Sequence, residues 1–126
     1  METSKQIHRH QKLSIHYWHN AQHYIVAKDA EKASEFVWGA ITQALKAAAL
    51  AKGRPLRSHD SIKKYALELR KTGFEDIYEA FSLAQALHGN FYETGLSIEE
   101  VAITAEKVKE AVNKLLLLTI PEESTQ

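Results

Sequence analysis

Residues 30–60 read AEKASEFVWGAITQALKAAALAKGRPLRSHD and carry the clearest structural signal in the chain. Up to residue 52 this segment has apolar side chains on almost every side at helical spacing. Such a helix cannot face water, so other helices must surround it. Gly53 and Pro55 then end the helix, and a short basic loop leads to Ser58, which can cap the next one. The segment therefore predicts an all-α fold with a central helix.

The rest of the chain shows the same helical periodicity, and its few Gly and Pro residues fall between the periodic segments. The predicted helices run over about residues 7–28, from 30 to 52, from Ser58 to before Gly73, over 75–92 and from Ser97 onward. Four long helices with short connections predict an antiparallel up-down bundle, with one short helix in addition. We expect residues 1–126 to form a single domain, with about 1–6 and 119–126 frayed.

Composition limits the class of protein. The chain has 126 residues, of which 44% are hydrophobic and 25% charged, as in ordinary globular proteins. It has no cysteine, which excludes disulfides and thiolate metal sites. No apolar run approaches the roughly 20 residues that span a bilayer, and the N-terminus has no signal-peptide pattern. We therefore expect a cytoplasmic protein without membrane contact.

The charge is unevenly distributed along the chain, although the net charge is zero. Residues 46–71 hold eight basic and two acidic side chains, a local charge of +6. Residues 72–106 hold seven acidic side chains and no Lys or Arg, a local charge of −7. These segments could form two solvated faces, a basic surface for a ligand or RNA, or two opposite patches through which the chain associates with itself.

Two blocks of the sequence carry a family resemblance: KASEFVWGAITQALKAAALAKGRPLRSHD (residues 32–60) and AFSLAQALHGNFYE (residues 80–93). Together, in this order and at this separation, they resemble the HEPN superfamily and are most similar to its small archaeal PaREP branch. The resemblance covers roughly residues 10–118. It implies an antiparallel helical bundle, association with nucleotides or RNA, and a homodimer or a nucleotidyltransferase-type protein partner.

Some members of that superfamily are ribonucleases with an Arg-x4–6-His motif on a helix, usually facing the same motif across a homodimer. The chain contains Arg54-Pro-Leu-Arg-Ser-His59, which has this spacing but lies in the loop after the central helix. His88 lies in the later helix, where the family places the motif, and has no arginine four to six residues before it. We therefore expect the nuclease motif to be absent, with Arg54, His59 and His88 as the candidate catalytic residues.

The segment from Lys52 to Lys71 is the predicted ligand surface. Its arginines could hold a phosphate, while His59 could act as a base in metal-independent RNA cleavage. The alternative is that residues 58–60 cap a helix and the arginines are solvated. The candidate ligand-binding residues are Lys52, Arg54, Arg57, His59, Lys63, Lys64, His88, Asn90 and Tyr92.

Histidines occur in two further places. His16, His19 and His23 fall within about 60° of one another on the first helix, a spacing that can gather imidazoles around Zn²⁺. They lie away from the apolar stripe, so we expect a solvated face without a metal. His88 lies on the apolar stripe of its helix, either as a hydrogen-bonded core residue or as part of a pocket with Asn90 and Tyr92 that stacks a base.

The central helix also carries a stripe of small and polar residues: Glu35, Gly39, Thr42 and Lys46. Glycine inside a helix costs about 1 kcal/mol relative to alanine, which a close helix contact at Gly39 would offset. That contact could be a dimer seam or packing within the chain.

No phosphate-binding glycine loop, nucleophile elbow or H-E-x-x-H motif is present, and no cofactor is predicted. Three functions follow from these observations. The first is a non-enzymatic module that binds a nucleotide or RNA through the Lys52–Lys71 surface, as a homodimer or with a nucleotidyltransferase-type partner. The second is a toxin-like, metal-independent ribonuclease, and the third is a purely structural dimerisation module.

Overall fold

A computed structural model describes residues 2–94 and 97–120, apart from the side chains of residue 2 and of residues 90–94. Within these ranges the chain forms five α-helices and no strand. The helices are α1 (Glu2–Val26), α2 (Ala30–Ala51), α3 (His59–Lys71), α4 (Glu75–Thr94) and α5 (Ile98–Leu117). The prediction of an all-α protein is therefore confirmed.

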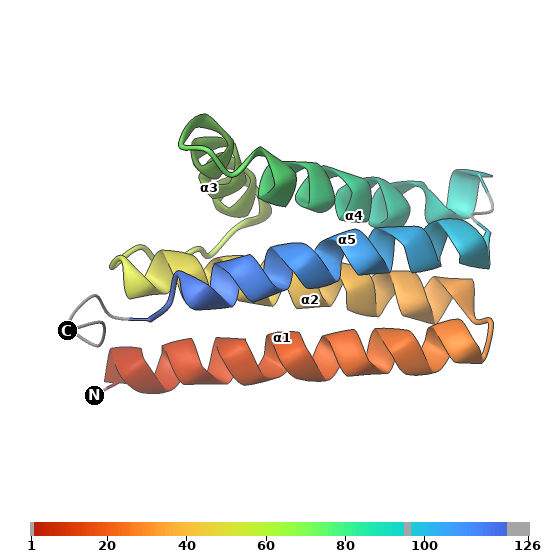
Figure 1. The fold of residues 1–126 in the computed structure, drawn as a ribbon, viewed down its shortest axis with the longest axis horizontal. Helices are drawn as coiled ribbons and strands as arrows, with labels where there is room; N and C mark the ends of the chain where they lie inside the picture. Colours follow the sequence, from red (N-terminus) through yellow and green to blue (C-terminus); the bar gives the residue numbers. More distant parts are fainter. Residues whose placement is uncertain (1, 95–96, 121–126) are drawn as a thin grey trace.

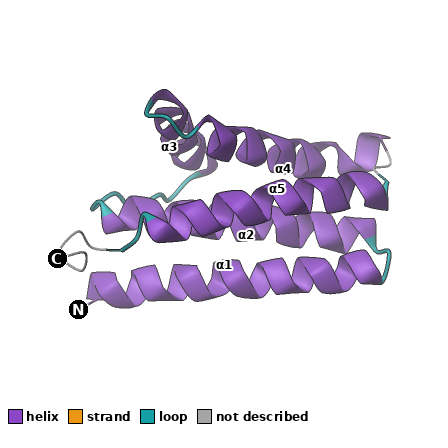
Figure 2. Ribbon diagram, in the orientation of Figure 1, coloured by secondary structure: helices purple, strands orange, loops and turns teal. Residues whose placement is uncertain are grey.

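The four long helices form one bundle. Figure 1 shows α1, α2, α4 and α5 extended along the long axis, with α2 behind α5. The short helix α3 is seen nearly end-on and crosses the direction of the others. A short connection reverses the chain between α1 and α2, and α3 with its two flanking loops leads from α2 to α4 (Figure 2). Within the described ranges, no helix is both long and apolar enough to cross a bilayer.

The central helix is α2, which packs against all four other helices. Its buried side chains cover more than half of its circumference at 100° per residue, and they are mostly alanines with a few larger residues such as Val37, Ile41 and Leu45. Small side chains allow neighbouring backbones to come close, because little volume separates the helices. The expectation drawn from residues 30–52 is therefore met.

The helix ends follow the local signals in the sequence. Asp29, Ser58 and Ser97 cap α2, α3 and α5, and each side chain accepts a hydrogen bond from the backbone N–H three residues later, at 3.1, 3.0 and 3.2 Å. Gly53 and Gly73 follow α2 and α3 with φ of 78° and 102°. These left-handed conformations suit glycine because it has no Cβ.

The two ends of the described chain differ from the sequence-based expectation. The first helix begins at Glu2, earlier than the predicted residue 7. Thr119 is buried, and its hydroxyl accepts a 2.6 Å hydrogen bond from the Gln11 side chain. This contact ties the segment after α5 to α1.

Gly39 lies against the ring of Tyr17. A Cβ built at Gly39 would approach Tyr17 Cδ2 to 2.9 Å, which is closer than real Cβ atoms come to other atoms. Of the two explanations that the sequence left open, packing within the chain accounts for this glycine.

Candidate functional site

Arg54 is held by α3. Its guanidinium donates two hydrogen bonds to the Glu68 carboxylate, at 3.0 and 2.6 Å, and lies 5.3 Å from the centre of the Tyr65 ring. Hydrogen bonding to Glu68 raises the pKa of Arg54, and the same bonds lower the pKa of the Glu68 carboxyl. A guanidinium paired with a carboxylate in this way is not a free phosphate ligand.

The other predicted ligand residues of this surface divide into paired and unpaired cations. Lys64 forms an exposed ion pair of 3.2 Å with Asp60 on the same helix. Lys52, Arg57 and Lys63 are exposed and form no ion pair with the described part of the chain. The predicted surface therefore keeps only part of its positive charge for a ligand.

His59 and His88 both lie against the indole of Trp38. The ring centres of His59 and Trp38 are 5.6 Å apart, and those of His88 and Trp38 are 5.4 Å apart with the planes only 12° from parallel. Phe81 packs against the same indole at 5.4 Å. The fold thus brings two histidines from α3 and α4 onto one aromatic side chain of α2.

His88 is exposed, so the first of its two predicted roles, that of a hydrogen-bonded core residue, is wrong. The buried face of α4 contains Ile77, Ala80, Phe81, Ala84 and Leu87. His88 lies at the edge of this face, where Trp38 covers the core and the imidazole stacks outside it. The pocket predicted from His88, Asn90 and Tyr92 involves side chains of residues 90–94, which lie outside the described structure.

A cleft lined by basic side chains lies between α1, the C-terminal part of α2 and the loop after it. We call it the basic cleft; its volume is about 240 Å³. Among the described side chains, its lining consists of Gln6, Arg9, His10, Lys46, Leu50, Pro55, Leu56 and Arg57 and includes no acidic residue. Arg9, Lys46 and Arg57 form no ion pair within the described ranges. Their positive charge is available to an anion in the cleft.

A shallow groove of about 460 Å³ lies next to the basic cleft on α1. It is lined by Lys5, His8, Arg9, Lys12, Leu13 and His16. Arg9 lines both depressions, so they form one continuous basic surface. Residues 3–28 contain no Asp or Glu, so this part of α1 contributes only basic side chains to that surface.

The α1 histidines proposed as metal-ligand candidates are exposed. His16 Nε2 lies 3.4 Å from Asn20 Nδ2, while His19 and His23 contact the aromatic residues that precede and follow them in sequence, Trp18 and Tyr24. Within the described residues, no group of three or more His, Asp or Glu side chains could hold a metal ion.

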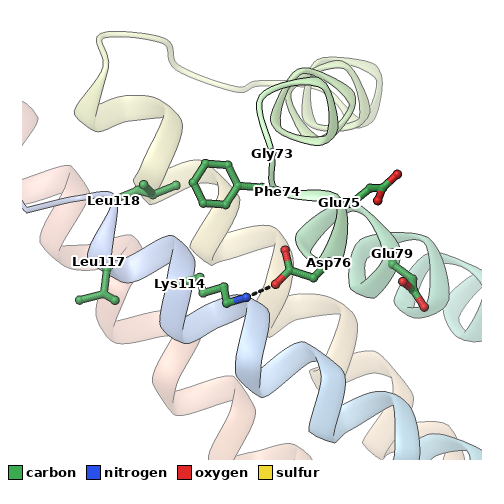
Figure 3. Close-up of a pocket in the computed structure, with 8 residues that line it drawn as sticks. All are labelled: Gly73, Phe74, Glu75, Asp76, Glu79, Lys114, Leu117 and Leu118. Carbon is green, nitrogen blue, oxygen red and sulfur yellow. Dashed lines mark hydrogen bonds and ion pairs between the residues drawn. The ribbon is translucent and has the colours of Figure 1, made fainter.

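A further groove, of about 670 Å³, lies between the start of α4 and the end of α5 (Figure 3). It is lined by Gly73, Phe74, Glu75, Asp76, Glu79, Lys114, Leu117 and Leu118. Lys114 donates a hydrogen bond to Asp76 and thereby lowers the pKa of the Asp76 carboxyl. Glu75 and Glu79 lie 3.9 and 3.8 Å from cations of α3 and α5. Because each carboxylate is paired, this groove is a weaker candidate for a charged ligand than the basic cleft.

Comparison with known proteins identifies the family. The model of the archaeal PaREP1/PaREP8 family matches residues 9–112. The chain belongs to the archaeal PaREP1/PaREP8 family. The crystal structure of a Sulfolobus solfataricus protein is similar to this PaREP1/PaREP8 chain, with a TM-score of 0.73 and 23% identity, over 84% of this chain and 95% of that one. At this identity the likeness supports the shared fold alone. No curated protein matches the chain.

The cleft residues of this PaREP1/PaREP8 protein were only partly predicted. Arg57 was a candidate, and Lys46 was counted in the basic run, whereas Arg9 and His10 were missed. The available signal was the absence of acidic residues from positions 3–28. That signal marks α1 as basic, but only the packing of α1 on α2 places Arg9 beside Lys46 and Arg57.

Proposed function

We propose that this protein is a non-catalytic module that binds a nucleotide or RNA through its phosphate groups in the basic cleft. One observation carries the proposal. Arg9, Lys46 and Arg57 come from α1, α2 and the loop after α2, and they line one depression that has no acidic residue among its described side chains. Like charges gathered in this way repel one another, and a bound anion would relieve the repulsion.

The chemistry of the lining suits a phosphate ester. The two guanidiniums can each donate paired hydrogen bonds to phosphate oxygens, and Lys46 adds a point charge. Leu50, Pro55 and Leu56 supply an apolar wall that a ribose or base edge can contact. A volume of about 240 Å³ lies just below the range of roughly 300–1,000 Å³ for drug-sized ligand pockets. A phosphate and its sugar would therefore fill the cleft, and the base would project from it.

This site is displaced from the surface predicted from the sequence. Arg54 and Lys64 are paired with Glu68 and Asp60, so α3 offers less positive charge than its composition suggests. Arg57 is the predicted residue that also lines the basic cleft.

Calorimetric titration with ATP, ADP and inorganic phosphate tests the proposal. Replacing both Lys46 and Arg57 by glutamine should weaken ATP binding at least about tenfold, because a charge-assisted hydrogen bond contributes about 1.5–3 kcal/mol. Arg70→Gln is the matched control, because Arg70 is an exposed cation of α3 outside the cleft. Absence of binding to the wild-type protein, or equal binding by the double variant and the control, would refute the site.

Assembly is part of the same proposal. The HEPN resemblance implies a homodimer or a nucleotidyltransferase-type partner. Size-exclusion chromatography with light scattering tests the homodimer. A monomer at high protein concentration would exclude it and leave a different protein as the partner.

A second candidate function, the metal-independent ribonuclease, is favoured by the position of His59 and His88 on Trp38. Two imidazoles that both reach the substrate can divide the roles of general base and general acid in RNA cleavage. Incubation of RNA with wild-type protein and with His59→Ala and His88→Ala tests this function. Cleavage that both substitutions abolish would establish it. Intact RNA at high protein concentration would exclude the ribonuclease. If the protein were also a dimer that binds no nucleotide, the remaining function would be that of a purely structural dimerisation module.

A further inference from the structure

The solvent-facing side of α1 is a strip of cations and imidazoles. We call it the α1 strip; it consists of Lys5, His8, Lys12, His16, His19 and His23. All six side chains are exposed. At 100° per residue they fall within an arc of about 80°. No acidic residue occurs between positions 3 and 28. The strip therefore presents one sign of charge along the helix.

The strip continues the basic cleft. Arg9 lines the cleft and also the shallow groove that holds the first part of the strip. Neighbouring members are three or four residues apart, a spacing of roughly 5–6 Å on a helix surface. From Lys5 to His23 the strip is about 27 Å long at 1.5 Å per residue. A ligand longer than one nucleotide could therefore extend from the cleft along α1.

The combination of lysines and imidazole rings in the α1 strip favours one class of polyanion, single-stranded nucleic acid, over an acidic peptide. Proteins that bind single-stranded nucleic acid combine a positively charged groove with aromatic side chains on which bases stack. Imidazole rings are among the side chains that stack on unpaired RNA bases. An acidic peptide could use Lys5 and Lys12, but it has no bases to place on the histidines. The histidines are also not gathered as metal ligands within the described residues.

We propose that single-stranded nucleic acid binds along α1, with its phosphates on Lys5, Arg9 and Lys12 and its bases on the exposed imidazoles. The inference rests on the proposed function, since one phosphate of the strand occupies the basic cleft. It names the ligand class as an oligonucleotide rather than a free nucleotide.

Fluorescence anisotropy with labelled oligouridylate about eight nucleotides long tests this inference, beside calorimetry with ATP. The wild-type protein should bind the oligonucleotide at least about tenfold more tightly than ATP at low salt. Replacing both Lys5 and Lys12 by glutamine should reduce the slope of log K against log salt by about 1.4, since each phosphate contact in a single strand contributes about 0.7. ATP binding by this variant should be unchanged, because neither lysine lines the basic cleft.

The matched control replaces Lys28 and Lys71 by glutamine, which removes two exposed charges outside the strip. It should bind the oligonucleotide as the wild-type protein does, with the same salt slope. Equal oligonucleotide binding by control and strip variant would overturn the inference. A wild-type affinity for the oligonucleotide no higher than that for ATP would also overturn the inference. If the wild-type protein bound neither ATP nor the oligonucleotide, the proposed function itself would be refuted. Thermal melting of each variant confirms that it is folded.

A second variant, His16→Ala with His19→Ala, tests the stacking role. It should weaken oligouridylate binding about tenfold, since base stacking is a substantial part of single-strand affinity. Binding of a poly-glutamate peptide should be unaffected by this variant. An acidic peptide that binds as tightly as the oligonucleotide, with both ligands insensitive to the histidine changes, would overturn the assignment to nucleic acid. Oligodeoxythymidylate in place of oligouridylate shows whether the strand is read as RNA or as any single strand.

Discussion

At Gly39, α1 packs tightly on α2, because the ring of Tyr17 occupies the space that a side chain would need. Gly39→Ala should lower the free energy of unfolding by about 1 kcal/mol. The gain in helix propensity of about 1 kcal/mol is smaller than the 1–3 kcal/mol that overpacking typically costs. Urea unfolding measures the difference.

Gly89 provides the matched control for this prediction. It lies in α4, and a Cβ at this position would meet no atom within 4 Å. Gly89→Ala should therefore raise the free energy of unfolding by up to about 1 kcal/mol. Stabilisation by both substitutions would show that Tyr17 moves away without cost.

Tyr65 carries the buried hydroxyl that lacks a hydrogen-bond partner in the described structure. Burial raises the pKa of this hydroxyl. Tyr65→Phe should leave the free energy of unfolding unchanged or raise it by up to about 1 kcal/mol, because it removes a polar atom that lost its water on folding. A clear loss of stability in urea unfolding would show that the hydroxyl has a partner in solution.

At the scale of the helices, Lys114 of α5 and Asp76 of α4 join the two elements by an ion pair. The pair lowers the pKa of Asp76, so it stabilises the fold above the ordinary Asp value of about 3.9. The contribution is lost as the pH falls through the lowered pKa. Asp76→Asn should therefore cost less than about 1 kcal/mol at neutral pH, since both side chains are about half exposed, and nothing near pH 2.

Denaturant unfolding at the two pH values measures this difference. Glu106→Gln is the control, because Glu106 is an exposed carboxylate of α5 without an ion pair in the described ranges. It should not reproduce the pH dependence. A loss for Asp76→Asn that persists at the lower pH would show that the ion pair is not the source of the effect, because asparagine keeps an oxygen that can accept the hydrogen bond from the Ile77 backbone.

The helices themselves were predictable because their signals are local. The apolar surface of residues 30–52, the caps at Asp29, Ser58 and Ser97 and the glycine stops all act within a few residues. The site was less predictable because it depends on distant segments. A helix diagram places His88 on the apolar stripe, yet its imidazole is exposed and stacks on the partly buried Trp38.

The basic cleft shows the same limit in another form. Arg9 is far from Lys46 and Arg57 in the sequence. Counting charges along the chain therefore places Lys46 and Arg57 in one basic segment, residues 46–71, and leaves Arg9 out. Only the antiparallel packing of α1 on α2 adds Arg9. The ion pair between Arg54 and Glu68 likewise removes a cation that the sequence offers.

At the scale of the whole molecule, the helices differ in the number of other helices that they contact. The central helix α2 packs against all the others, whereas α3 contacts only α2 and α4. Hydrogen exchange should therefore be slowest in the middle of α2, where amides open only on global unfolding, and faster in α3, which can open locally. Mass spectrometry of peptides from the two helices measures this order. Equal protection would show that the molecule opens as one unit.

Fully enclosed alanines such as Ala40, Ala44 and Ala48 along α2 also constrain how this chain can drift in sequence. Enlarging one of them pushes on a packed neighbour, so accepted changes must come as compensating pairs on two helices. The exposed positions of α1 are under no such restriction. Relatives that keep these alanines of α2 could therefore diverge in the residues of the α1 strip. New ligand preferences could then arise on an unchanged fold.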